Sequence, residues 1–436
     1  MTTYTEKSST GIILDRQFYQ YNSSGQLVKM VDKDSNEIRF EYGSNGLLGL
    51  SILIDGNTIE SNYNIDISGI IQSSSFSFMD IPIGSISRDY ETTGLMRLEG
   101  NLLVMTINQL NTGSVATYYG YDTNSSRVNS VTIDIGQDED NDYVITYEYD
   151  ELGNITLIQY LDGLNIIKSF EYTYDSLNRL STEDILLVNE SYSNLYRYDS
   201  NGNIIGVLKY EYNQIPTFVL NSSDFPVNED YHIASKTYEY STEWLDQLES
   251  YVTMDNVEHQ FTYDNQGNPL IITNFDFRGI TYNHAHLTWF GRQLTSISVE
   301  NENNQVLATL SYSYNDQGYR TKKIITVGSV IETYVYELLT STVYFEKYTN
   351  SSNASLNYEI SYLIDTGNEI IGFVYNDDAY YYLKDIQGNI LSVVDNTGAI
   401  LVQYEYDAFG NLINNPSGTI ANINPYTYRG YRTDSE

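Results

Sequence analysis

The 436-residue sequence contains no cysteine, only two tryptophans and only six prolines. Without cysteine the chain cannot form disulfides, use a thiol as a nucleophile or bind a metal through thiolates. Basic residues are also scarce, because 22 Lys and Arg stand against 58 Asp and Glu, which gives a net charge of −36. Phosphate backbones and anionic lipids are bound by clustered Lys and Arg, so we expect neither a nucleic-acid partner nor an anionic membrane surface.

Long apolar runs are missing as well. The most apolar stretch, residues 46–56, is interrupted by Gly, Ser and Asp, so we expect no membrane span. The first twenty residues lack the basic and apolar regions of a signal peptide. The 41% hydrophobic residues suffice for a folded interior, and the length predicts either two or more domains or one extended repetitive body.

Tyrosine is abundant instead, with 44 residues, and it marks an internal repeat. The repeat consists of an aromatic residue, any residue, Tyr, Asp or Asn, two residues, Gly, a polar residue and an aliphatic residue. Clear copies lie at 147–155 (YEYDELGNI), 172–180 (YTYDSLNRL), 196–204 (YRYDSNGNI), 261–269 (FTYDNQGNP), 312–320 (YSYNDQGYR) and 404–412 (YEYDAFGNL), with looser copies at 18–27, 40–48 and 381–390. Where copies adjoin, the Gly position recurs every 21 to 25 residues.

Each copy predicts a strand, a tight turn and a second strand. Two Tyr at i and i+2, such as Tyr172 and Tyr174, lie on one face of an extended chain. The Asp after them can accept hydrogen bonds from backbone N–H groups two residues on, and the Gly, such as Gly202 or Gly410, accepts a positive φ in a hairpin loop with a bulge. Asn178 takes the Gly position in one copy.

These patterns predict an all-β fold: a long antiparallel sheet of many short hairpins that curls into a partial shell. Residues 241–251 (STEWLDQLESY) are the exception, since they fit a helix as well as a loop. We divide the chain into a divergent N-terminal β-region at 1–140, with degenerate repeats, and a repeat shell at 141–436. The acidic run at 136–142 indicates an exposed loop, and residues 213–230 indicate a surface insertion.

The repeat copies resemble the tyrosine–aspartate (YD) repeats of the Rhs family, which includes bacterial polymorphic toxins and the related teneurins. The likeness is strongest at 287–297, 314–323, 370–411 and 424–436, which are similar to the Rhs-associated core and the region before it. The resemblance implies a long antiparallel sheet that spirals into a hollow shell around a C-terminal toxin. It also implies a core segment that cleaves the toxin off by aspartyl-type autoproteolysis.

The sequence departs from the family after the TDSE at 433–436. Family members continue there into the cleavage motif and a variable toxin, whereas this sequence stops at Glu436. We therefore expect neither self-cleavage nor an enclosed toxin in this chain, and we expect Asp434 to lie in a loose tail. By the resemblance the protein is secreted or lies at the cell surface, and the toxin would be its partner in longer relatives.

Candidate catalytic and metal-binding residues are few. The four histidines are His232, His259, His284 and His286, and the last two share a face if residues 284–289 form a strand. A zinc site there would need a third ligand that the sequence does not specify, so we expect a structural or surface pair. No nucleophile elbow, Walker loop or dinucleotide-binding glycine motif occurs.

Two acidic runs, at 32–41 and 138–142, partly resemble a calcium-binding EF-hand loop. The first places Glu37 where that loop needs Gly, and the second places Tyr143 there. Both runs therefore indicate solvated turns. We assign no catalytic, cofactor-binding or metal-binding residue, and with 58 acids only a cleft with converging carboxylates and a raised pKa would indicate an enzyme.

The tyrosine pairs allow three interpretations. They can form cross-strand ladders in which each hydroxyl finds a partner, line the inside of a shell, or form cages for sugars or choline. The leading functional hypothesis is a non-catalytic shell scaffold of an Rhs-type secreted or surface protein. The alternative is a carbohydrate- or cell-surface-binding module, although such cages rely on Trp, and this chain has only Trp244 and Trp289.

Overall fold

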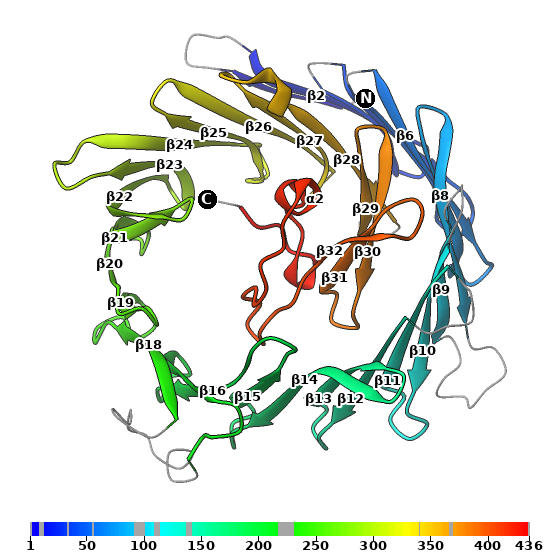
Figure 1. Cartoon of the computed structure of the whole chain (residues 1–436). Helices are drawn as coiled ribbons and strands as arrows, with labels where there is room; N and C mark the ends of the chain where they lie inside the picture. Colours follow the sequence, from blue (N-terminus) through cyan, green and yellow to red (C-terminus); the bar gives the residue numbers. More distant parts are fainter. Residues whose placement is uncertain are drawn as a thin grey trace.

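A computed structural model describes residues 2–7, 13–32, 35–54, 56–90, 101–108, 114–136, 142–216, 231–339, 341–365 and 369–434. These residues form 32 strands, and each strand pairs antiparallel with its neighbours in sequence, so the sheet is one continuous meander from β1 to β32 (Figure 1). The prediction of an all-β fold is confirmed.

The N-terminal part of the sheet consists of β1 (Thr2–Lys7), β2 (Ile13–Tyr21), β3 (Leu27–Val31), β4 (Glu37–Tyr42), β5 (Leu47–Ile54), β6 (Asn57–Ile65), β7 (Ile71–Phe78), β8 (Ile81–Tyr90), β9 (Leu102–Asn108), β10 (Ser114–Tyr121) and β11 (Val128–Ile135). The middle part consists of β12 (Tyr143–Tyr149), β13 (Ile155–Asp162), β14 (Asn165–Tyr174), β15 (Leu180–Leu186), β16 (Ser191–Tyr198), β17 (Ile204–Glu211), β18 (His232–Tyr240), β19 (Leu248–Val252), β20 (Glu258–Tyr263), β21 (Pro269–Phe277) and β22 (Ile280–Phe290).

The C-terminal part consists of β23 (Gln293–Glu300), β24 (Val306–Tyr314), β25 (Arg320–Val327), β26 (Val330–Leu339), β27 (Thr342–Asn350), β28 (Tyr358–Ile364), β29 (Ile370–Tyr375), β30 (Asp378–Lys384), β31 (Ile390–Val394) and β32 (Ile400–Gln403). Helical structure among the described residues is limited to η1 (Ala354–Leu356), α2 (Thr419–Ile423) and η3 (Tyr428–Gly430). Within the described ranges no helix has the length and apolar composition needed to cross a membrane.

The repeat turns have the predicted geometry. In the copy at 147–155, Asp150 Oδ1 accepts hydrogen bonds from the backbone N–H groups of Gly153 and Asn154, and Asp150 Oδ2 accepts one from the Asn154 side chain. Gly153 has a φ of 96°, and the register shifts between Glu148 and Tyr149, which is the expected bulge. Asn178, at the Gly position of the next copy, also has a positive φ of 64°.

The second Tyr of each pair links neighbouring hairpins. Its hydroxyl donates to the backbone carbonyl at the start of the preceding hairpin's strand, as in the bonds from Tyr149 to Val128, Tyr174 to Ile155, Tyr198 to Leu180, Tyr240 to Ile204, and Tyr314 to Leu294. Trp289 makes the equivalent bond to Pro269 through its Nε1. The interpretation of the tyrosines as partnered cross-strand residues is confirmed for these positions. In the N-terminal region Tyr90 and Tyr121 make the same bond to Ile71 and Leu102.

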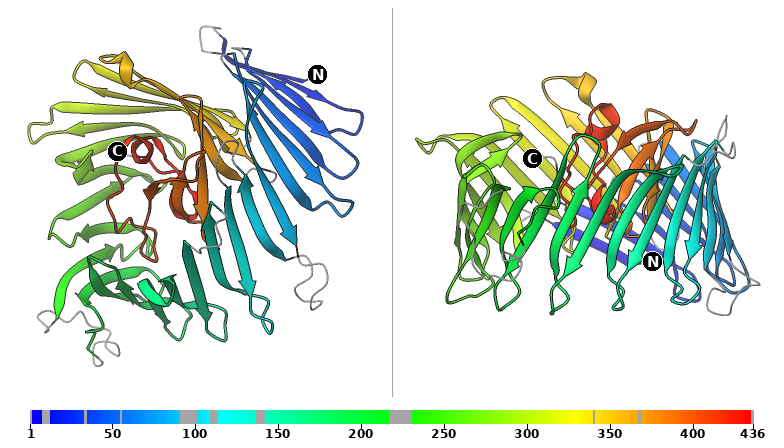
Figure 2. Two further views of the ribbon diagram at one scale, coloured as in Figure 1. Left: turned by 45° about the vertical axis from the view of Figure 1, so that its right-hand side comes forward. Right: turned by 60° about the horizontal axis from the view of Figure 1, so that its bottom comes forward.

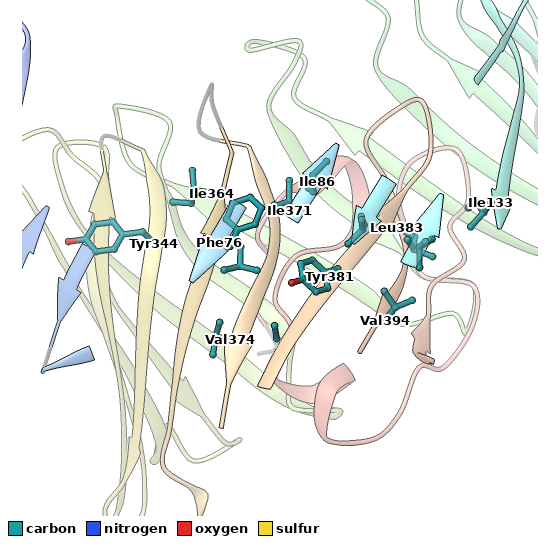
Figure 3. Close-up of a cluster of buried hydrophobic side chains, with 14 of the residues drawn as sticks. Phe76, Ile86, Ile133, Tyr344, Ile364, Ile371, Val374, Tyr381, Leu383 and Val394 are labelled. Carbon is teal, nitrogen blue, oxygen red and sulfur yellow. The ribbon is translucent and has the colours of Figure 1, made fainter. Parts of the chain in front are cut away.

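The sheet curls into an open ring that overlaps itself (Figures 1 and 2). The last strands, β28 to β31, lie inside the early strands, and the two layers share a core to which Phe76 and Ile86 contribute from outside and Ile364 and Leu383 from inside (Figure 3). Polar contacts join the same layers, because Tyr63 donates to the Ile364 carbonyl at 2.8 Å. The overlap closes the apolar faces of both layers without closing the ring.

The segment at 241–251 is not a helix. Residues 241–247 form a loop in which the Gln247 N–H donates to the Trp244 carbonyl, and β19 begins at Leu248. The loop follows Tyr240, which makes the usual repeat bond, so the segment is a longer version of the repeat turn. A single short helical pattern is too weak to persist in isolation, and strand pairing on both sides prevails.

The predicted domain boundary near residue 140, the acidic loop and the insertion at 213–230 lie only partly within the described residues. The strands on either side of residue 140, β11 and β12, pair with each other, so the sheet runs through the expected domain boundary. Whether residues 1–140 and 141–436 behave as separate units stays a prediction. The acidic run at 138–142, apart from Asp142, and most of the insertion at 213–230 lie outside the described residues.

Candidate functional site

The C-terminal segment, residues 404–434, lies inside the ring and contacts its wall from within (Figures 1 and 2). The segment contains α2 and η3, and its apolar side chains Tyr404, Ile423 and Tyr426 pack on the inner face of β28 to β31. These strands therefore form a middle layer between the early strands outside and the C-terminal segment inside. The candidate functional site is the contact between this segment and the wall.

The last described residues of the segment are held by charged residues of the wall. Arg320 on β25 donates two hydrogen bonds to the Asp434 carboxylate, at 2.6 and 2.9 Å, and Lys323 Nζ lies 3.2 Å from it. Burial would raise the pKa of Asp434, but the hydrogen bonds from Arg320 and the positive charge of Lys323 outweigh it and lower the pKa to about 2. The expectation that Asp434 lies in a loose tail is wrong, because an ion-pair network holds it against the wall.

A second ion pair anchors the same stretch. Arg432 Nη2 lies 2.6 Å from Glu346 Oε2 on β27, and the Arg432 guanidinium lies over the ring of Tyr336 at 4.3 Å. Glu346 is almost fully buried, so its charge is compensated inside the protein and not by water. The aromatic wall and the buried acid together fix the direction of the chain before Asp434.

A buried glutamate holds the start of the segment. Glu183 on β15 has no exposed surface, and its Oε1 accepts a hydrogen bond from the backbone N–H of Ala408 at 2.7 Å. Its Oε2 accepts bonds from Tyr196 and Asn194. Burial is the main cause of a pKa raised to about 7, and the nearby charge of Asp407 acts in the same direction, while the bond from Tyr196 opposes it.

A cavity of about 400 Å³ lies next to this anchor, between the wall and the C-terminal segment. Its wall side carries Tyr160, Tyr172 and Tyr174, and its segment side carries Glu405 and Asp407. All three tyrosines therefore line the inside of the shell, and Tyr174 also links two hairpins, so the first two interpretations both hold for Tyr174.

Three carboxylates, those of Asp385, Glu405 and Asp407, line this cavity, as carboxylates would line the cleft of an enzyme, and Glu183 lies behind Ala408. Burial raises the pKa of Asp385, against the hydrogen bonds from Asn389, and the pKa of Glu183 is raised as well. Each of the carboxylates is also engaged in the framework: Asp385 and Asp407 accept the bonds of their own repeat turns, and Glu405 pairs with Lys168 at 3.0 Å. Burial and framework bonds account for their positions.

The four histidines have different surroundings. His259 is buried and stacks on Tyr251 with ring centroids 4.4 Å apart, and His232 hydrogen-bonds with Ser235. His284 and His286 alternate on β22 as predicted, and the structure adds Glu300 from β23 beside them. Nothing in the sequence singles out Glu300, because it lies fourteen residues beyond His286 and only the strand register joins them.

The first calcium-like run is a repeat turn where the structure describes it. Asp32 Oδ1 accepts the Asn36 N–H at 2.8 Å, and Asp32 Oδ2 accepts the Asn36 side chain at 2.7 Å. Asp34 lies outside the described residues. Of the second run only Asp142 is described, and it accepts a hydrogen bond from the Ile135 N–H.

Sequence reasoning did not single out Glu183, Glu346, Arg320 or Lys323. A signal was present for Glu346, which follows Val343, Tyr344 and Phe345 in its strand, but not for Glu183, which lies between polar residues in LSTEDIL. Such a buried acid needs partners. The partners themselves come from distant parts of the chain, which the repeat pattern does not connect.

No family model matches the chain. Over 204 residues, 47% of the chain, it is 28% identical to the tRNA3(Ser)-specific nuclease WapA of Bacillus spizizenii and to the tRNA nuclease WapA of Bacillus subtilis. The matched part spans only 8% of each WapA protein.

Solved structures cover nearly the whole chain. A crystal structure of TcdB2–TccC3 without the hypervariable C-terminal region covers 99% of this chain at 14% identity and a TM-score of 0.57. The Photorhabdus luminescens Tc holotoxin pore with a TccC3 mutation covers 99% at 15% identity and a TM-score of 0.60. This chain spans 25% and 24% of those chains. It therefore has the same fold as about a quarter of the TcdB2–TccC3 chain and resembles WapA in sequence over about half of its own length.

Proposed function

We propose that this chain is a non-catalytic β-shell scaffold of the YD-repeat (Rhs) family, from a secreted or surface protein. Its role is to hold C-terminal sequence inside the ring, and in longer forms of the protein a C-terminal toxin. The observation that carries the proposal is that Glu183 at one point and Arg320 at another bind the C-terminal segment from the inner wall.

The comparisons support this role. The TcdB2–TccC3 structures share the fold, and one of them was solved without a hypervariable C-terminal region. The WapA relatives are named as tRNA nucleases, and the small share of WapA that is matched suits a shell segment beside a separate enzymatic part. The toxin partner is carried over from these relatives as part of the proposal.

Protease protection tests the proposal. A short unstructured peptide with one specific protease site is appended after Glu436 in one protein, and the same peptide precedes Met1 in another. Enclosure predicts that the C-terminal site is cut more slowly than the N-terminal site, and that Arg320→Ala speeds up only the C-terminal cut. Equal cleavage at both sites in the parent protein would show that the ring does not shield a peptide attached to the C-terminal segment.

The non-catalytic part of the proposal has its own test. The carboxylates beside the cavity are held by framework bonds, so we expect the chain to leave its own backbone intact. Intact-mass measurement after days at pH 5 to 7 should return the full 49.8 kDa. A discrete shorter product that disappears in Asp385→Asn or Glu183→Gln would restore an enzymatic role.

The alternative of a carbohydrate- or cell-surface-binding module stays a prediction. Trp244 is half exposed and is the more accessible of the two tryptophans, but the described tyrosines of the repeat mostly use their hydroxyls within the sheet. A glycan array decides this alternative, because specific binding that Trp244→Ala abolishes would favour it over the scaffold role.

A further inference from the structure

His284, His286 and Glu300 form a cluster on the outer face of the ring. The residues between and beyond the histidines, Ala285 and Leu287, pack in the apolar cluster that also holds Ile325. Ile325 shares a strand face with Lys323, which contacts the enclosed C-terminal segment. Because strand neighbours alternate between faces, the two histidines point away from the enclosed segment.

The strand register brings the three side chains together. Glu300 lies directly opposite His284 in the β22–β23 pair. His284 Nε2 is 3.1 Å and His286 Nε2 is 3.7 Å from Glu300 Oε2, and one ligand atom from each of the three residues lies within 4.8 Å of the others. The sheet itself, and not a loop, fixes these positions.

These distances suit a divalent metal ion. Zinc binds His nitrogen and Glu oxygen at about 2.0–2.2 Å in a tetrahedron, so its ligand atoms lie about 3.3–3.5 Å apart. The two nitrogen–oxygen distances bracket that value, and small side-chain rotations would bring the cluster to it. Imidazole ligands favour zinc and related transition metals over calcium and magnesium, which prefer oxygen.

The surroundings also favour a cation. The chain carries a net charge of −36, and the ion pairs of Glu300 among the described residues are those with the two histidines, so no Lys or Arg neutralises it there. The His284 and Glu300 side chains are mostly buried, at 17% and 12% exposed, whereas His286 is 46% exposed. His284 and Glu300 are thus held in place by their surroundings, and the site is open to solvent at His286.

We propose that His284, His286 and Glu300 bind a divalent transition metal ion of the zinc class on the outer face of the shell. The three side chains supply three ligands of a tetrahedral site, and the fourth position faces solvent, where water or a group from a partner completes it. The proposal is independent of the scaffold function, because the site lies on the other face of the sheet.

The test uses the whole chain stripped of metal with a chelator and then dialysed against zinc chloride in excess calcium. Excess calcium competes with zinc for the many surface carboxylates, so the zinc that stays bound after dialysis is held at sites with histidine ligands. We expect about one zinc ion per chain by elemental analysis. Cobalt(II) as a probe should give the absorption spectrum of tetrahedral coordination, with zinc displacing it.

Variants decide between a metal site and a simple hydrogen-bonded cluster. Loss of a direct ligand in His284→Ala or His286→Ala should weaken zinc binding at least about tenfold, since loss of an outer-shell partner alone has that effect. Glu300→Gln keeps the size and a hydrogen-bond acceptor, so it should fold while binding zinc more weakly. His232→Ala is the matched control and should bind as the parent does.

Circular dichroism and the melting temperature without metal show whether each variant is folded. Retention of zinc by the parent with loss in folded Glu300→Gln supports the proposal. No retention by the parent, or equal retention in the His284→Ala/His286→Ala double variant, overturns it and leaves the three residues as a hydrogen-bonded cluster.

Discussion

The hydroxyl of Tyr174 donates a hydrogen bond to the backbone carbonyl of Ile155, 2.7 Å away on the neighbouring strand. Tyr174 precedes the turn of one repeat, and Ile155 follows the turn of the repeat before it. The bond therefore joins consecutive repeats at the same end of the sheet, and its recurrence in other copies explains why Tyr directly precedes Asp in the motif.

Removing this hydroxyl should destabilise the sheet measurably. Tyr174→Phe keeps the ring and leaves the Ile155 carbonyl without its partner, so we expect a loss of about 1 kcal/mol in the free energy of unfolding. Chemical denaturation measures it. Tyr431→Phe is the control, since Tyr431 is mostly exposed, and it should change nothing. Equal effects from the two changes would mean that the inter-repeat bond contributes nothing.

Two turn glycines distinguish the cost of backbone strain from the cost of steric overlap with a neighbouring side chain. Gly202 has a φ of 96° with open space around it, so Gly202→Ala should cost about 1–2 kcal/mol through backbone strain alone. Gly410 has a φ of 89°, and a methyl group there would also overlap the ring of Tyr428. Gly410→Ala should therefore lower the melting temperature more than Gly202→Ala.

A double variant tests whether the Tyr428 ring causes the extra cost at Gly410. Because the extra cost at Gly410 comes from the Tyr428 ring, Tyr428→Ala combined with Gly410→Ala should cost less than the sum of the two single changes. Additive effects would contradict the packing explanation and leave strain as the whole cost.

The ion pairs that hold Asp434 against the wall should weaken at low pH. The pKa of Asp434 is lowered to about 2 from 3.8, so the ion pairs stabilise the fold fully above about pH 4, and this contribution is lost as the pH falls towards 2. Asp434→Asn should remove up to about 2 kcal/mol at neutral pH and speed hydrogen exchange at 425–434. Glu359→Gln, which breaks the exposed pair with Lys347, should cost less than about 1 kcal/mol. Unchanged exchange at 425–434 in Asp434→Asn would refute the anchoring role.

The contribution of Glu183 to stability should depend on pH in the opposite direction. Its pKa rises from 4.5 to about 7 on folding, so between these values the folded state keeps a proton that the unfolded state has lost. Its contribution is therefore fully present below about pH 4.5 and declines as the pH rises to about 7, by about 3 kcal/mol.

Glu183→Gln tests this sign. The amide resembles the protonated acid, so the variant should lose the decline and exceed the parent in stability above pH 7. Glu190→Gln, at a half-exposed acid paired with Lys209, should keep the pH profile of the parent. Denaturant midpoints across pH 4 to 8 measure both. A Glu183→Gln profile that parallels the parent would show that this carboxyl is already charged throughout.

The repeat made the local structure predictable. Asp150, Gly153 and Tyr149 act within a few residues or with the adjacent hairpin, so their spacing in the sequence reveals their partners. The loop at 241–247 was ambiguous because its helical pattern is short and its role depends on the strands around it. The contact of Glu183 with Ala408 was out of reach, since 225 residues separate them and only the curvature of the whole sheet brings them together.

The overlap of the ring has a consequence for the order in which the protein is made. Among the described residues, the backbone of each strand pairs only with the strands synthesised just before and just after it, so the meander can grow hairpin by hairpin as the chain leaves the ribosome. The contact between Tyr63 and Ile364 spans 301 residues and must wait until the inner layer emerges. Until then the early strands carry an uncovered apolar face, which makes the nascent chain most prone to aggregation before β28 to β31 arrive.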